Sequence, residues 1–326
     1  MITVFGGGSI GLVLAARLAR AGRPVRVCTR REEDAEGIAA SGIDVEEPET
    51  GARWNARVIA QAGPPVGERD PIFACVREPD APIAAAQLAA ASPHATIVNV
   101  QNGLDGDAVF AERFARVVGA VIRHNCTRVD AHFARSQRNA RIVVGAFPEG
   151  GGDDVEAIAA LLRDAGYDTG VSTRIAEDRW LKLCVNLMST PNALVRPSEH
   201  ETRAFTEGKA RLLEEARDVL AAAGIAARSC DGRDRSLDAE IEFQRSALAR
   251  GVAARKLPLY NSLWQGLARG AALEVDAYHR QILSLGARHG VATPVNARGL
   301  AGLERVVRES LGPESLGAAE LLGACA

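Results

Sequence analysis

The segment Gly6-Gly7-Gly8-Ser9-Ile10-Gly11 has residue types and spacing suited to binding a phosphate group. It fits the pattern G-x-G-x-x-G, follows a β-branched run and opens a helical stretch, which is the context in which this pattern predicts a dinucleotide site. Gly6 allows a tight turn, Gly8 lets the backbone approach a diphosphate, and Gly11 lets the helix pack closely on the strand. We therefore expect Gly6, Gly7, Gly8, Ser9, Ile10 and Gly11 to contact a dinucleotide cofactor; the alternative is a flexible glycine turn.

Two arginines, Arg30 and Arg31, end the second apolar run, where a protein that prefers NAD carries an acidic residue for the ribose 2′-hydroxyl. Guanidinium groups can instead bind a 2′-phosphate bidentately. The pair therefore predicts NADP(H) rather than NAD(H) as the cofactor. The alternative is a solvated basic pair balanced by Glu32, Glu33 and Asp34.

Lys182 and Asn186 lie in the almost wholly apolar run Trp180–Met188. Their spacing places both side chains on one face of a helix, one turn apart. An unpaired ammonium in apolar surroundings is costly, and burial lowers its pKa towards a value at which it can release a proton. Arginine cannot do this, and only three of the 39 basic residues are lysines. We predict proton transfer by Lys182; the alternative is a stem that covers the core with its charge in water.

Other polar residues occupy positions that favour either a ligand contact or an ordinary structural role. Asn102, in Val100-Gln101-Asn102-Gly103, follows an apolar run and is expected at the carboxyl edge of a sheet, although Asn-Gly is also a common turn pair. Asn261-Ser262 precedes a helical stretch and could be a helix N-cap. Glu274 could be an acidic residue of a first helical turn.

The sequence patterns around these residues predict a different architecture for each half of the chain. The first half alternates β-branched runs with helical patterns, which indicates a parallel sheet covered by helices. After about residue 172 only helical periodicity continues. We predict an α/β protein, with an N-terminal Rossmann-type doubly wound sheet (1–172) and an all-α C-terminal domain (173–326). The expected strands are Ile2–Phe5, Pro24–Thr29, Ile72–Val76, Thr96–Val100, Val117–Ile122 and Arg141–Phe147, and the expected helices are 9–21, 80–91, 105–114, 153–166, 176–190, 208–222, 236–254 and 272–288.

The composition excludes several classes of protein. With 326 residues, 47% of them hydrophobic, the chain can build two cores, and its net charge of −2 gives no field that would attract nucleic acid or an acidic membrane. No run approaches the 18 apolar residues of a membrane span. Six cysteines are scattered without CxxC spacing, so we expect a cytoplasmic protein with reduced thiols and no metal site.

Taken together, these segments resemble the ketopantoate reductase family, which reduces ketopantoate to pantoate with NADPH in pantothenate synthesis. The similar segments are FGGGSIG (5–11), the arginine after the second strand, VQNG (100–103), RWLKLCVN (179–186), NSLWQ (261–265), LEVDAY (273–278) and ARHGVATPVN (287–296). The resemblance implies that Lys182 gives a proton to the ketone oxygen while the nicotinamide delivers hydride. It implies that Asn186 and Ser262 hold the substrate, that Asn102 lies between substrate and cofactor, and that Glu274 contacts the cofactor or orients Lys182.

The chain departs from the family pattern near the expected substrate side. Thr190 stands where the family usually has a second asparagine, Gly266 replaces an aspartate, and Arg77 replaces a common lysine. Thr190 is expected to contact the substrate, which is ketopantoate or another branched or aromatic 2-oxo acid. A non-catalytic NADP-binding regulator on the same fold is a further alternative. An apolar helical face in the second domain could pair two chains as a homodimer.

Overall fold

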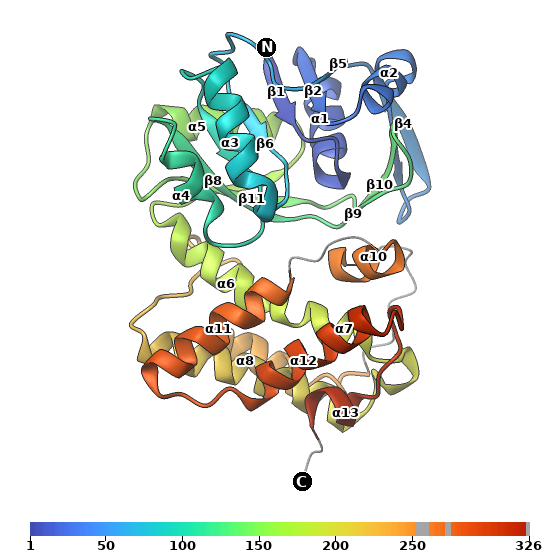
Figure 1. The fold of residues 1–326 in the computed structure, drawn as a ribbon, viewed down its shortest axis with the longest axis vertical. Helices are drawn as coiled ribbons and strands as arrows, with labels where there is room; N and C mark the ends of the chain where they lie inside the picture. Colours follow the sequence, from blue (N-terminus) through green and yellow to red (C-terminus); the bar gives the residue numbers. More distant parts are fainter. Residues whose placement is uncertain (252–260, 271–274, 324–326) are drawn as a thin grey trace. The chain divides into compact units, whose positions relative to one another are not determined.

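The computed structural model describes residues 1–251, 261–270 and 275–323, and the chain divides into two compact units between Asp178 and Arg179 (Figure 1). Every strand of the two sheets lies in the first unit, and the described part of the second unit is helical. The predicted fold class, a Rossmann-type α/β region followed by helices, is confirmed. Separate domains of 1–172 and 173–326 stay a prediction.

The main sheet of the first unit has eight strands in the order β12-β11-β8-β7-β6-β1-β2-β5. Strands β7, β6, β1, β2 and β5 run parallel, as does β8 beside β7, so their carboxyl ends share one edge. Strand β11 pairs with β8 antiparallel. The strands are β1 (Ile2–Phe5), β2 (Val25–Thr29), β5 (Ile59–Ala62), β6 (Ile72–Ala74), β7 (Ile97–Asn99), β8 (Val117–Arg123), β11 (Arg141–Ala146) and β12 (Asp168–Val171).

A second, four-stranded sheet has the order β4-β3-β10-β9 and is absent from the sequence-based prediction. Its strands are β3 (Ile43–Glu47), β4 (Ala52–Ala56), β9 (Cys126–Arg128) and β10 (Phe133–Ser136). They are short and rich in charged residues, with sequences such as IDVEE and ARWNA. Their β-branched content is too low for the pattern on which strand prediction depends.

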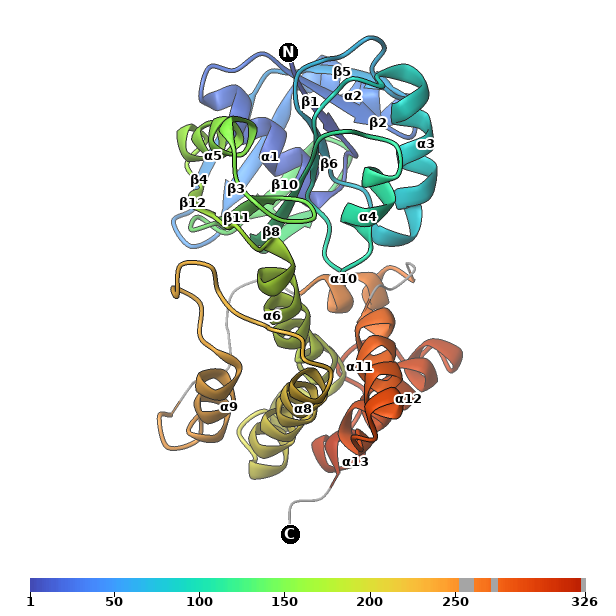
Figure 2. The same cartoon turned by 90° about the vertical axis from the view of Figure 1, so that its left-hand side faces the viewer.

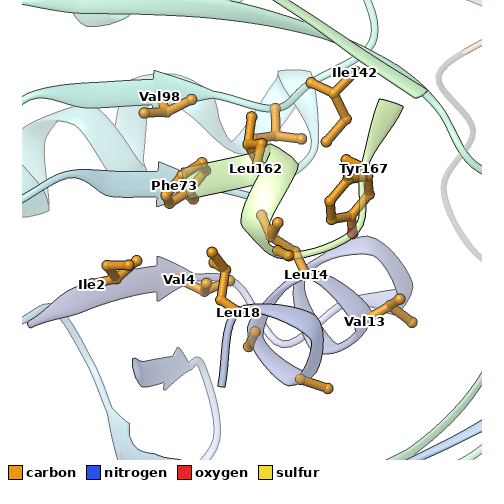
Figure 3. Packing of buried hydrophobic residues seen from close by; sticks show 14 of the residues in the cluster. Ile2, Val4, Val13, Leu14, Leu18, Phe73, Val98, Ile142, Leu162 and Tyr167 are labelled. Atoms are coloured by element: carbon orange, nitrogen blue, oxygen red, sulfur yellow. The ribbon is translucent and has the colours of Figure 1, made fainter. Parts of the chain in front are cut away.

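Helices cover both faces of the main sheet (Figure 2). Helices α1 (Ser9–Arg20) and α5 (Asp153–Asp164) pack on one face, and α3 (Ala81–Ala91) and α4 (Gly106–Ala111) on the other. Figure 3 shows the first of these cores, in which Leu14 and Leu18 of α1 lie beside Val4 and Phe73 of the sheet. The remaining helices of this unit are α2 (Glu32–Ser41) and the short η1 (Glu78–Asp80).

The second unit is built around a long helix, α8 (Arg203–Ala222), which contacts α9, α11, α12 and α13. Its residues Leu212, Leu213, Ala216, Val219 and Leu220 are buried, which confirms the apolar face predicted from the sequence. The other helices that belong to this unit or lead into it are α6 (Ile175–Leu187), α7 (Ser189–Leu194), η2 (Pro197–Glu199), α9 (Leu237–Arg245), α10 (Ser262–Ala268), α11 (Val275–His289), α12 (Pro294–Arg308) and α13 (Ala318–Leu322).

The predicted helix 176–190 is two helices, because α6 ends at Leu187 and α7 begins at Ser189. Pro191 has no backbone N–H to donate to the carbonyl of Leu187, so a continuous helix would lack a bond at this point. None of the helices in the described part of the chain is long and apolar enough to cross a membrane.

Candidate functional site

The glycine-rich segment forms the turn between β1 and α1, and two of its glycines are required by the fold itself. Gly6 has φ +118°, and a Cβ there would lie 2.6 Å from the carbonyl oxygen of Cys75. A Cβ on Gly11 would lie 1.9 Å from the carbonyl oxygen of Gly6. Both positions therefore exclude a side chain, as close packing of strand, turn and helix demands.

Gly8 is not required for either of these reasons. Its φ of −75° is open to any residue, and a Cβ there would meet nothing within 4 Å. Gly8 is the N-cap of α1 and has no side chain that could accept from the N–H groups of the first turn. That turn also holds no acidic residue. The N-terminal N–H groups of a helix attract anions. The space beside Gly8 therefore fits a diphosphate that approaches the backbone closely.

The end of β2 carries an ion-pair network that includes one of the predicted arginines. Arg31 donates to Asp34 through Nε (3.1 Å) and Nη2 (2.8 Å), and Arg128 donates to the same carboxylate through Nη2 (2.8 Å). Burial raises the pKa of Asp34, but the hydrogen bonds and charges of the two arginines outweigh it and hold the pKa below its ordinary value. Arg30 is exposed. Asp34 is thus an ionised partner of arginines, and Arg128 had no signal in the sequence.

Asn102 follows β7, and the loop that carries it is held in place by its neighbours. Gly103 has φ +106°, and a Cβ there would lie 2.2 Å from the Glu78 carboxylate, which also accepts a hydrogen bond from the N–H of Asp105 (3.0 Å). Asn102 itself is half-buried. Because β7, β6, β1 and β2 are parallel neighbours, Asn102, the glycine turn and the arginines all lie along one sheet edge.

Lys182 and Asn186 lie one turn apart on α6, and both are half-buried. The residues between and beside them, Leu181, Leu183, Cys184 and Leu187, are buried. From Trp180 to Leu187 the helix therefore carries one partly accessible polar pair among apolar residues, as the sequence of this run predicted.

Ser262 is exposed and is the first residue of α10. Asn261 is the N-cap of this helix: its Oδ1 accepts from the N–H of Trp264 (2.8 Å), and its Nδ2 donates to the carbonyl of Ser189 (3.2 Å). Ser262 is thereby tethered to the start of α7, three residues beyond Asn186. Glu274, the predicted cofactor contact, lies outside the described residues.

Thr190 lies in the interior of the second unit. Its side chain is fully buried, and its Oγ1 is 2.8 Å from Nε2 of His279, which is also fully buried. Nδ1 of His279 is 3.0 Å from Oδ1 of Asn296, whose amide donates to the Glu215 carboxylate (2.9 Å). A substrate contact at Thr190 is still only a prediction; the geometry shows a hydroxyl that joins α7 to α11.

Lys209, on α8, had no motif around it in the sequence, yet its surroundings are unusual. Burial lowers the pKa of its ammonium to about 8, with the Glu240 charge acting in the opposite direction. Its Nζ lies 3.3 Å from Oδ1 of Asn192 and 4.6 Å from the centre of the Phe205 ring, on which His200 is stacked. Helical spacing alone does not reveal a cluster built from three separate segments.

Family models match nearly the whole chain. The model described as ketopantoate reductase PanE/ApbA matches residues 2–149, and the one described as its C-terminal part matches residues 174–304. The chain belongs to the ketopantoate reductase family. The resemblance inferred from its motifs is confirmed, and with it an oxidoreductase that acts on CH–OH groups.

Relatives of similar length support this family assignment. A 2-dehydropantoate 2-reductase of Caulobacter vibrioides is 30% identical, and the match covers 91% of this chain and 95% of the relative. One of Halobacterium salinarum is 27% identical over 94% of this chain and 98% of the relative. D-mandelate dehydrogenase, solved with NADH and anilino(oxo)acetate, shares the fold with a TM-score of 0.79 and 16% identity, over 95% of this chain and 99% of that one.

Proposed function

We propose that this ketopantoate reductase family member reduces 2-dehydropantoate to (R)-pantoate with NADPH, as a step of pantothenate biosynthesis in the cytoplasm. The observation that carries the proposal is the position of Gly8, which neither backbone conformation nor internal packing reserves for glycine. A cofactor phosphate that approaches the backbone would reserve it. The names of the curated relatives supply the substrate.

The residues of the first unit would hold the cofactor along the carboxyl edge of the main sheet. Gly6 to Gly11 would face the diphosphate, and Asn102 would lie at the nicotinamide end, two strands from β1. Bound there, NADPH supplies the hydride that reduces a ketone. Because the only carboxylate in the network at the end of β2, Asp34, accepts from two arginines, it is a poor acceptor for a ribose hydroxyl. Arg30 and Arg31 therefore favour a 2′-phosphate.

The polar pair on α6 would serve the substrate. Addition of hydride to a 2-oxo acid makes an alkoxide, and the Lys182 ammonium both stabilises this charge and gives it a proton. Asn186, one turn away, and Ser262 would bind the substrate carboxylate or hydroxyl. Glu274 would contact the cofactor or orient Lys182.

Steady-state turnover tests the proposal, with NADPH and NADH each assayed against ketopantoate and a panel of branched and aromatic 2-oxo acids. We expect preference for NADPH and ketopantoate. Lys182→Ala should lower kcat by about 10²–10⁴-fold while NADPH binding is retained, and Lys209→Ala is the matched control. A Lys182→Ala enzyme with normal kcat would refute the assignment of the acid. NADPH binding without turnover of any 2-oxo acid would favour a non-catalytic regulator.

A second candidate is a reductase for another branched or aromatic 2-oxo acid. The burial of Thr190 favours it, because the hydroxyl that replaces the family's asparagine is engaged by His279. The same panel separates the two candidates: an aromatic 2-oxo acid with a higher kcat/KM than ketopantoate would select the second. We also propose a homodimer, since a ketopantoate reductase of Staphylococcus aureus with this fold is dimeric; light scattering after size exclusion would test this.

A further inference from the structure

Arg128 links the second sheet to the glycine-rich turn. It ends β9, and its guanidinium donates from all three nitrogens: Nη1 to the carbonyl oxygen of Gly7 (3.0 Å), Nη2 to Asp34 (2.8 Å) and Nε to the carbonyl oxygen of Asp130 (2.7 Å). Only 24% of its side chain is exposed. A planar guanidinium held at three points is fixed in orientation.

The bond to Gly7 determines how the turn presents its backbone. The peptide unit between Gly7 and Gly8 is planar and trans, so its C=O and N–H point in opposite directions. A donor that holds the Gly7 carbonyl therefore directs the N–H of Gly8 away from Arg128. A Cβ on Gly8 would meet no other atom within 4 Å, so there is open space beside this residue.

The bond to Asp34 sets the charge at the end of β2. Arg31, Asp34 and Arg128 share two ion pairs and carry a net charge of +1. Without Arg128, Asp34 would neutralise Arg31, and the remaining pair would carry no net charge. Both carboxylate oxygens of Asp34 accept from arginine, one from Arg31 alone and one from both.

We propose that Arg128 is a positioning residue for the cofactor. It orients the Gly7–Gly8 peptide, and it cancels the charge of Asp34 so that the arginines after β2 favour a 2′-phosphate. This inference rests on the proposed function and goes beyond it, because Arg128 belongs to the second sheet and to no segment of the dinucleotide motif. The role has two parts: the hydrogen bond to the turn strengthens binding of any dinucleotide, and the charge favours NADPH over NADH.

Calorimetric titration of the full chain with NADPH and with NADH separates these parts. Arg128→Met removes the donors and the charge, and we expect the Kd for NADPH to rise about 10–100-fold, the cost of losing a charged hydrogen bond. The Kd for NADH should rise less, so that the NADPH preference falls about fivefold. Arg128→Lys keeps the charge without the planar fork; it should weaken both nucleotides and leave their ratio within about twofold of wild type.

Arg135→Met is the matched control, since Arg135 lies on β10 of the same sheet and pairs with Glu46. It should bind both nucleotides as the wild type does. Circular dichroism and melting curves establish that each variant is folded, and Arg128→Lys gives the test if Arg128→Met is not. An unchanged Kd for NADPH, or a lysine variant that loses the preference as fully as the methionine variant, would overturn the role of Arg128 alone. Wild-type protein that binds neither nucleotide would overturn the proposed function with it.

Discussion

Acidification should destabilise the first unit through one buried imidazole. His124 is 8% exposed, and its Nε2 lies 2.8 Å from Oγ of Ser136 and 3.1 Å from the carbonyl oxygen of Gln137. Burial, and then the charge of Arg17, lower its pKa to about 3, although the Gln137 carbonyl acts in the opposite direction. Its Nδ1 has no hydrogen-bond partner within the described residues. The folded protein therefore keeps His124 neutral where the unfolded chain protonates it.

The sign and size of the effect follow from proton linkage. The pKa of His124 is about 6.5 in the unfolded chain and about 3 in the folded one. The contribution of His124 to the free energy of unfolding is therefore largest above pH 6.5, and it is lost as the pH is lowered towards 3. At this site the unfolded chain binds about a quarter of a proton more than the folded chain at pH 7, and nearly one proton more at pH 5. The loss is about 2 kcal/mol over that interval.

Urea unfolding at pH 7, 6 and 5, followed by circular dichroism and tryptophan fluorescence, measures this loss. His124→Gln keeps a neutral donor towards Gln137 but does not titrate, so its unfolding free energy should fall by about 2 kcal/mol less than that of the wild type. His94→Gln, at an exposed position, is the control and should follow the wild type. Each variant lacks one histidine and shares every other titrating group with the wild type. If His124→Gln loses as much stability as the wild type, the assignment to His124 is refuted.

Substitutions at three positions test other parts of the molecule. Gly11→Ala should destabilise the fold by more than about 2 kcal/mol in thermal or urea unfolding, because its Cβ would overlap the Gly6 carbonyl. Gly8→Ala should be at least as stable as the wild type, by up to about 1 kcal/mol, yet bind NADPH more weakly in a calorimetric titration; unchanged binding would contradict a phosphate at this position. Thr190→Val should cost about 1–3 kcal/mol because it leaves Nε2 of buried His279 without its hydroxyl partner, whereas Thr190→Ser should stay close to wild type; equal losses would show that the methyl group matters instead.

Local patterns in the sequence predicted the parts of the fold that depend on local chemistry. The glycine turn lies between β1 and α1 as expected. Gly11 is required by a contact within the turn, and Gly6 by its backbone conformation and by Cys75, which follows the neighbouring strand β6. Lys182 and Asn186 share a helix face because helical spacing alone determines it. The family followed from the order of such segments along the chain.

Contacts between distant segments could not be predicted in this way. Arg128 is 121 residues from Gly7, and it belongs to a sheet whose charged strands lack the β-branched pattern. Thr190 was expected to contact the substrate because it stands at a position where the family usually has an asparagine, and that contact stays a prediction. The bond between its hydroxyl and His279 on another helix gave no signal in the sequence. Lys209 gained its low pKa from burial among three segments, which composition does not encode.

The open space beside Gly8 has a consequence for engineering. Replacing a glycine by alanine at a position whose φ and surroundings accept it restricts the unfolded chain and commonly adds about 0.4–1 kcal/mol of stability. Gly8 meets both conditions in this structure. Stability engineering guided by the protein structure alone would accept alanine at Gly8 and reject it at Gly11, three residues further along the same segment. If the proposed function holds, selection for heat resistance would thus remove a glycine that the cofactor requires and the fold does not, so such libraries should hold Gly8 constant.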